Sequence, residues 1–276
     1  MTPGAGTGGR ERRESLATDL ARRGGLRRAV GLSTVGPPAL TLVVILGVWQ
    51  AAVVVSDAPS VVLPSPGEVV TTLVADRSVL LAEGLVTGAT AGLGLLAGAL
   101  VGIALAFAVV RSRAVGSVVI PYVIALRIAP VIAIAPLLFL WFGRGIPTRA
   151  LLVATLALFP MTVATIDGLR STPEKYLLLL ESVGASSWTT FTKVRLPAAA
   201  PSVFAGLKIA ATLSVIGAVV AEFVTLDAGL GTRVFVASTG LRTAEAYAAL
   251  VALSLLGIAF YAVPAAAERA IRSRFR

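Results

Sequence analysis

Six long apolar stretches constrain the fold of this sequence more than any other feature. A helix needs about 20 apolar residues to cross the hydrocarbon core of a bilayer, and each stretch approaches that length. They cover residues 38–55, 85–110, 114–142, 148–166, 201–224 and 244–267. Only 14% of the 276 residues are charged, against about 25% in a typical soluble domain. The sequence therefore predicts an all-α polytopic membrane protein with about six transmembrane helices.

Cysteine and histidine are both absent from the chain. Their absence excludes disulfides, the usual zinc sites and hydrolysis by a Ser-His-Asp triad. An intramembrane hydrolase would have to use Glu222 or Lys208 as its base. We therefore expect a transport subunit rather than an enzyme, with no cofactor bound by this chain.

The basic residues are distributed unequally between the two sides of the predicted spans. Of 24 Lys and Arg residues, 18 lie in residues 1–36, 111–117, 167–208 and 269–276, and five lie in the alternate loops. Because cytoplasmic loops carry the excess of Lys and Arg, we expect both termini to be cytoplasmic. The net charge of +10 does not indicate nucleic-acid binding, since no aromatic residues alternate with the arginines.

The charge pattern also divides the chain into three parts. Residues 1–36 are predicted to form a basic, partly disordered cytoplasmic tail with a Gly-rich start. Residues 37–268 are predicted to form the transmembrane domain, which sits in the lipid bilayer. Residues 269–276 are predicted to form a short basic cytoplasmic tail.

The connection between the fourth and fifth stretches, about residues 167–200, is long enough to have structure of its own. Thr172-Pro173 is a helix-start signal, with Thr at the cap and Pro at the first helical position. Gly184 is predicted to end this helix, because a left-handed turn is most favourable at glycine.

A second short helix is predicted to begin near Ser186 or Ser187. It should end before Leu196-Pro197, because the residue before a proline disfavours helical backbone. Together the two helices would form a helix–glycine–helix knob on the cytoplasmic face.

The second short helix presents two aromatic residues with basic residues beside them, Trp188, Phe191, Lys193 and Arg195. An exposed apolar anchor with a basic rim is typical of a docking site for another protein. The same pattern is also typical of an amphipathic helix lying on the lipid surface. Both interpretations stay open at this point.

Charged and proline residues inside the spans mark a candidate translocation pathway. Arg127 lies within the third stretch, and an intramembrane charge indicates function by default. Pro130 and Pro136 free backbone carbonyls that can line a polar cavity. Glu222, an acidic residue within the fifth stretch, is a candidate partner for Arg127. Alternatively, Arg127 extends to the membrane interface and only anchors its helix.

The second stretch is rich in glycine. Its glycines are Gly88, Gly92, Gly94, Gly98 and Gly102. Small residues let transmembrane helices approach closely, so we expect them to pack against other helices rather than to conduct substrate.

The segment ESVGASSWTTFTKVRLPAAAPSVFAGLKIA, residues 181–210, resembles the signature loop of permease subunits of bacterial ABC importers that work with a substrate-binding protein. Gly184 matches the glycine of that signature, and Leu196-Pro197 matches its aliphatic-Pro pair. Three leucines at residues 178–180 stand where the family has a Glu-Ala-Ala triplet.

The resemblance extends from about residue 63 to the sixth stretch. LPSPGEVV (63–70) resembles an extracytoplasmic segment of this family. APVIAIAPLLFLWFGRGIP (129–147) resembles the subgroup that imports nitrate, sulfonates, taurine, and thiamine-pyrimidine or flavin compounds. Residues 206–234 are most similar to its thiamine-pyrimidine and riboflavin branch. The resemblance implies a type I ABC importer permease fold in a prokaryotic plasma membrane, translocating a small organic nutrient of one of these classes.

In that family the signature loop is a coupling helix that sits in a cleft of a cytoplasmic ATPase subunit. The resemblance assigns this role to Glu181, Gly184, Ala185, Ser186, Trp188, Phe191, Arg195 and Pro197. It implies three partners, namely ABC ATPase subunits that carry ATP-Mg, an extracytoplasmic substrate-binding protein, and a second permease copy in a homodimer. The chain itself has no GxxxxGK[ST] phosphate loop.

The alternative function is secondary transport driven by an ion gradient. Such transporters commonly contain inverted repeats and an intramembrane acid or histidine. The two halves of this sequence show no convincing repeat, histidine is absent, and Glu222 is the candidate acid within the fifth stretch.

Overall fold

The computed structural model describes residues 37–128 and 131–274, and every regular element in them is helical. The chain divides into two units, residues 1–59 and 60–276. Within the first unit, helix Pro37–Ser56 has 20 residues and is apolar enough to cross a membrane. The predicted basic tail, residues 1–36, lies outside the described residues.

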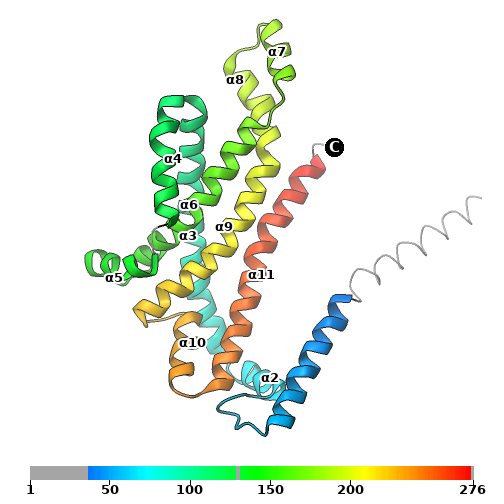
Figure 1. The fold of residues 1–276 in the computed structure, drawn as a ribbon, viewed down its shortest axis with the longest axis vertical. Coiled ribbons are helices and arrows are strands. Elements are labelled where there is room, and N and C mark those ends of the chain that lie inside the picture. The colour runs from blue at the N-terminus through cyan, green and yellow to red at the C-terminus, as the bar shows by residue number, and fades with distance from the viewer. Residues whose placement is uncertain (1–36, 129–130, 275–276) are drawn as a thin grey trace, which may run out of the picture. The chain divides into compact units, whose positions relative to one another are not determined.

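The second unit is a helical bundle in which α3, α6, α9 and α11 run alongside one another (Figure 1). Its elements are α2 (Pro66–Ala75), α3 (Arg77–Arg111), α4 (Arg113–Ile128), α5 (Val131–Phe142), α6 (Ile146–Arg170), α7 (Glu174–Ser182), α8 (Ser187–Thr190), the π turn η1 (Phe191–Arg195), α9 (Leu196–Thr225), α10 (Leu230–Thr239) and α11 (Thr243–Arg274). Helices α7 and α8 lie at one end of the bundle, and α2 and α10 lie at the other (Figure 1).

The predicted polytopic α-helical architecture is confirmed. Among the described residues, five helices are long and apolar enough to span a membrane, and the pair α4 and α5 would make a sixth. This pair corresponds to the predicted third stretch, residues 114–142, and its two helices are bent by 96° relative to one another. Helix α4 ends at Ile128, and α5 begins at Val131.

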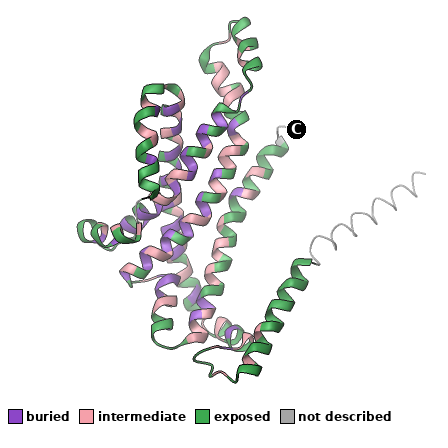
Figure 2. Cartoon of the chain, in the orientation of Figure 1, coloured by how far each residue is buried: buried purple, intermediate pink, exposed green. Residues whose placement is uncertain are grey.

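Glycines of α3 allow it to pack closely against α6. A Cβ atom added at Gly98 would lie 2.5 Å from the carbonyl oxygen of Ala154 and 2.8 Å from the Cβ of Ala157. Gly94 and Gly102 are equally buried against α6. The expectation of close helix packing is confirmed at these three positions. Burial is concentrated where α3, α6 and α9 meet (Figure 2).

Helix α2 was not anticipated from the sequence. Its start is a capping box, in which the Ser65 hydroxyl accepts a 3.2 Å hydrogen bond from the Glu68 amide and the Glu68 carboxylate accepts one of 2.7 Å from the Ser65 amide. The S-x-x-E spacing, with Pro66 at the first helical position, is a sequence signal for such a start.

Candidate functional site

The connection between α6 and α9 forms the predicted helix–glycine–helix segment, hereafter the α7–α8 knob (residues 174–195). Helix α7 ends in a Schellman motif, because the Gly184 amide donates to the carbonyl of Glu181 and the Ala185 amide to that of Leu180, at 3.0 and 2.9 Å. Gly184 has a φ of +69°, as predicted. This turn sets the angle between α7 and α8.

Helix α8 begins where the sequence predicts. The Ser186 hydroxyl accepts a 3.1 Å hydrogen bond from the Thr189 amide and thereby caps the helix. An N-terminal cap of this kind satisfies an amide that has no partner within the helix.

The predicted start of α7 is wrong by one residue. Pro173, with φ −60° and ψ 135°, is the N-cap, and the helix begins at Glu174. The Pro173 carbonyl closes the first turn by accepting a 3.1 Å hydrogen bond from the Tyr176 amide. The extended ψ of Pro173 gives it the backbone conformation of a cap residue, so Thr172 does not cap the helix.

The predicted end of the second helix, before Leu196-Pro197, is also wrong. Helix α8 continues through the π turn η1 into α9, so Ser187–Thr225 is one helix of 39 residues. In η1 the Leu196 amide donates to the carbonyl of Phe191, five residues earlier. This wider turn accommodates Pro197, whose ring would clash with the carbonyl four residues earlier in a regular helix.

Two aromatic residues of the knob lie in different surroundings, one packed against the bundle and one exposed. The Phe191 ring lies edge-on to that of Phe107 of α3, with centroids 5.3 Å apart, and 6.0 Å from the ring of Trp188. Trp188 itself is 72% exposed. Phe191 therefore anchors the knob to α3, while Trp188 remains available to a partner.

A groove of about 1,170 Å³ lies between the knob and the end of α3. The predicted coupling residues that line it are Glu181, Ala185, Trp188, Phe191 and Arg195. Gly184 and Ser186 shape the turn beside it, and Pro197 lies at the start of α9. The groove has aromatic walls and charges of both signs.

The continuity of α8 with α9 favours the docking interpretation over a helix lying flat on lipid. Trp188 is carried along the axis of a membrane-length helix, and the knob extends beyond the ends of the neighbouring α3 and α4 (Figure 1). An interfacial helix would instead lie across that axis, in the plane of the membrane surface.

The predicted pathway residues do not come together. The guanidinium of Arg127 lies 4.5 Å from the centre of the Phe159 ring, and its side chain is exposed. Glu222 is fully buried and accepts a 2.7 Å hydrogen bond from the Gly231 amide. The expected Arg127–Glu222 pair is therefore wrong. Pro136 lies within α5, and Pro130 lies outside the described residues.

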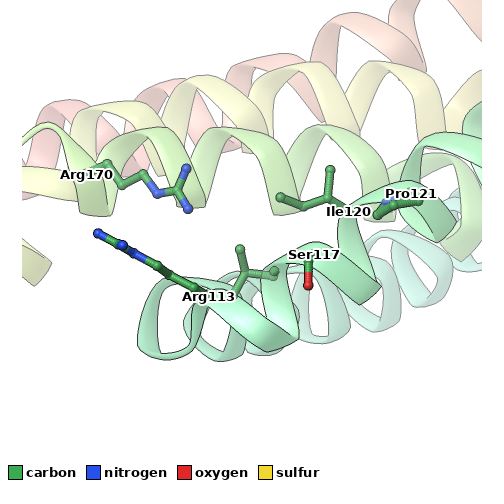
Figure 3. Close-up of a pocket in the computed structure, with 7 residues that line it drawn as sticks. Arg113, Ser117, Ile120, Pro121 and Arg170 are labelled. Atoms are coloured by element: carbon green, nitrogen blue, oxygen red, sulfur yellow. The ribbon is translucent and has the colours of Figure 1, made fainter.

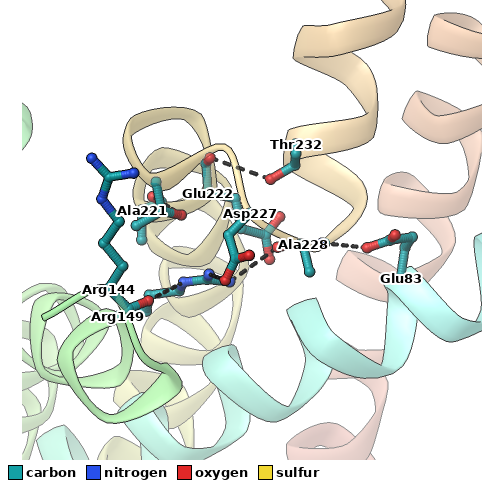
Figure 4. A network of polar contacts seen from close by, with 10 residues as sticks. Glu83, Arg144, Arg149, Ala221, Glu222, Asp227, Ala228 and Thr232 are labelled. Atoms are coloured by element: carbon teal, nitrogen blue, oxygen red, sulfur yellow. Dashed lines mark hydrogen bonds and ion pairs between the residues drawn. The ribbon is translucent and has the colours of Figure 1, made fainter.

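A buried arginine near the start of α6, which the sequence did not single out, joins two turns at the opposite end of the bundle. The Arg149 side chain is 2% exposed. It donates to the carbonyls of Arg144 and Ala228, at 3.1 and 3.0 Å, and pairs with the carboxylate of Asp227 at 2.8 Å (Figure 4). This contact holds the α5–α6 turn against the α9–α10 turn.

Two acidic residues hold the start of α10 in the same region. Glu83 of α3 accepts a hydrogen bond from the Gly229 amide, and Glu222 of α9 accepts one from the Gly231 amide. The hydroxyl of Thr87 accepts a 2.8 Å hydrogen bond from the Leu230 amide between them. Carboxylates are favourable at the N-terminus of a helix, where amides lack partners within the helix.

Comparison with known proteins agrees with this architecture. Residues 94–276 match the family described as binding-protein-dependent transport system inner membrane component. The chain is 36% identical to a probable ABC transporter permease protein of Haemophilus influenzae, over 81% of this chain and 91% of that protein.

Two further relatives have more specific descriptions. The formylaminopyrimidine transport permease protein ThiX of Halalkalibacterium halodurans is 33% identical, over 82% of this chain and 90% of its own. The riboflavin transport system permease protein RibX of Chloroflexus aurantiacus is 32% identical, over 83% and 87%. These matches confirm the resemblance found in the sequence. The chain belongs to the family of binding-protein-dependent ABC importer permeases.

Proposed function

We propose that this chain is the membrane-spanning subunit of an ATP-driven importer and that its α7–α8 knob couples it to a separate ATPase subunit. The observation that carries the proposal is the knob itself, an exposed tryptophan on a rigid two-helix turn continuous with a membrane-length helix. ATP-Mg would bind the partner ATPase, whose closure would move the knob.

The knob is suited to transmit force. The Schellman turn at Gly184 fixes the angle between α7 and α8, and the Phe107–Phe191 contact fixes the knob against α3. A displacement of the knob is therefore transmitted to α3 and α9 together. Movement of a rigid element against its neighbours is a common route from ligand binding to a change of access.

Cross-linking tests the docking site directly, because the chain has no cysteine. Ser187→Cys on the knob should cross-link to a cysteine placed in the ATPase cleft, in membranes containing the whole transporter. Ser238→Cys, exposed on α10 at the other end of the bundle, is the matched control and should not. Cross-linking of the Ser238→Cys variant but not of the Ser187→Cys variant would overturn the assignment.

The turn geometry is tested by Gly184→Val. A β-branched residue is strongly disfavoured at φ +69°, so ATP hydrolysis should become uncoupled from transport while the spans remain inserted. Substrate-stimulated ATPase activity equal to that of the wild type would contradict the role of the turn.

We further propose a prokaryotic plasma-membrane location with both termini cytoplasmic, supported by the excess of Lys and Arg on the side of the knob. A membrane-impermeant maleimide should label the Ser238→Cys variant in intact spheroplasts and the Ser187→Cys variant only after permeabilisation. The reverse pattern would invert the orientation.

For the transported compound we propose a small organic nutrient, such as a thiamine-pyrimidine precursor or a riboflavin-like compound, or else a sulfonate, nitrate or taurine. The proposal is supported by the descriptions of the relatives, which include formylaminopyrimidine and riboflavin permeases. The working assembly would be a permease homodimer with two ATPase subunits and one extracytoplasmic binding protein. Binding of a panel of these compounds to that binding protein, followed by uptake into proteoliposomes containing ATP, tests the substrate.

A further inference from the structure

A slot between α4 and α6 carries two arginines that the proposed coupling function does not use. At its mouth, Arg113 of α4 and Arg170 of α6 extend toward one another (Figure 3). Among the described residues, neither has an ion-pair partner. The mouth lies at the same end of the bundle as the α7–α8 knob.

Beyond Asp167 and Arg170 the walls of the slot are mostly apolar, and the Arg127 guanidinium lies 4.5 Å from the centre of the Phe159 ring that forms one of them. Both arginines line a cavity of about 350 Å³. Ile120 and Arg170 also line a second cavity of about 250 Å³. The second cavity is lined by Ile124 of α4 and by Phe159 and Val163 of α6. Ile124 is 45% exposed and Val163 is 37% exposed, so this part of the slot is open along its side.

The length of the slot matches one leaflet of a bilayer. Arg113 and Ile124 are eleven residues apart on α4, which corresponds to about 16 Å along a helix. Half of a hydrocarbon core is about 15 Å. A chain that begins at the arginine pair would therefore reach the middle of the membrane at Ile124.

The charge at the mouth suits a phosphodiester. Two guanidinium groups on facing helices can each donate to phosphate oxygens. Asp167, which lines the slot one turn before Arg170 and is exposed, can accept a hydrogen bond from a headgroup hydroxyl. The three side chains together carry a net charge of +1, which favours an anionic headgroup over a zwitterionic one.

We propose that this slot binds an anionic glycerophospholipid, such as phosphatidylglycerol, from the leaflet on the knob side. The phosphodiester lies between Arg113 and Arg170, and one acyl chain runs along the apolar walls. Basic pockets between transmembrane helices are known to suit anionic lipid headgroups. The lipid would fill the space between α4 and α6 and hold the bent third span beside the core helices.

Native mass spectrometry of the full-length transporter, incubated with equal amounts of phosphatidylglycerol and phosphatidylcholine, tests the proposal. The transporter should retain phosphatidylglycerol in preference to phosphatidylcholine. Arg113→Gln and Arg170→Gln should each reduce its retention about fivefold, the effect expected for one arginine near a charged lipid surface. Arg269→Gln removes an exposed arginine of α11 near the same end and should leave retention unchanged.

A second variant tests the apolar part without altering charge. Val163→Trp fills the slot at a position that is already partly exposed, so it should lower phosphatidylglycerol retention while the protein still elutes as a single species. The Arg269→Gln control decides between a specific site and general surface charge. If it lowers phosphatidylglycerol retention as much as Arg113→Gln and Arg170→Gln do, the lipid responds to general surface charge, and the proposal is overturned.

Two other occupants would also overturn it. If inorganic phosphate displaces phosphatidylglycerol at millimolar concentration, the arginines bind a free anion rather than a lipid. If Ser117→Cys, at the mouth of the slot, forms a disulfide between two permease copies, the slot is covered by a second copy of the chain.

Discussion

Gly229 lies directly against the carboxyl group of Glu222 where α9 turns into α10. A Cβ atom added at Gly229 would overlap the carboxyl carbon and oxygens of Glu222, and Gly229 has a φ of +120°. Two residues later, the Gly231 amide donates to the same carboxylate. The close approach of backbone to a buried acid is therefore built into this turn.

Gly229→Ala should destabilise the protein by about 3 kcal/mol, because both steric overlap and an unfavourable φ oppose the new methyl group. Gly184→Ala is the matched control. Gly184 also has a positive φ, but an added Cβ there meets no atom within 4 Å, so its cost should be about 1 kcal/mol. The midpoint of thermal unfolding in detergent measures both, and equal decreases would contradict the overlap at Glu222.

Arg149→Met should destabilise the protein by about 2 kcal/mol, because charged hydrogen bonds to two turns are lost. Asp227→Asn should lower the free energy of unfolding by less than about 1 kcal/mol, since the Asp227 side chain is 67% exposed. Thermal unfolding of the two variants distinguishes them. A larger decrease for Asp227→Asn would show that the ion pair, rather than the two backbone contacts, holds the turns together.

Trp188→Ala should leave stability within about 0.5 kcal/mol of the wild type while weakening association with the ATPase, because the side chain is largely exposed. Phe191→Ala should cost about 1 kcal/mol through loss of its contact with Phe107. Val236→Ala, which shortens an exposed apolar residue of α10, is the control and should leave association with the ATPase unchanged. Co-purification with the ATPase measures docking, and unimpaired co-purification of Trp188→Ala would contradict its assigned role.

Gly98→Ala should destabilise the protein by about 2 kcal/mol, since the new methyl group would be forced into the α6 backbone. Gly92→Ala should be neutral or slightly stabilising. Its added Cβ would lie 4.0 Å from the nearest atom, in the Phe260 ring, and alanine has the higher helix propensity. If both substitutions have the same effect on thermal unfolding, α3 and α6 do not approach as closely as described.

Local features of this chain could be predicted from sequence because their causes are local. The spans follow from apolar length, the turn at Gly184 from the tolerance of glycine for positive φ, and the start of α8 from the Ser186 cap. Each depends on residues within one or two helical turns of one another.

Long-range contacts could not be predicted in this way. Arg149 binds residues 78 and 79 positions away, and the apolar pattern gives no indication of which helix faces which. The pairing expected for Arg127 and Glu222 was wrong for the same reason. The second short helix does not end before Leu196-Pro197, as the sequence predicted, because a π turn accommodates the proline. The rule that prolines break helices does not take such a turn into account.

The uninterrupted helix Ser187–Thr225 has a mechanical consequence. Its 39 residues correspond to a rod of about 58 Å, with Trp188 near one tip and Glu222 near the other. Because Trp188 and Glu222 belong to one continuous helix, a displacement of the tryptophan would also move the end that bears the glutamate, where the Gly231 amide is bound. Under the proposed coupling, the two ends of this helix would move together along one backbone, with no relay of side chains needed in between.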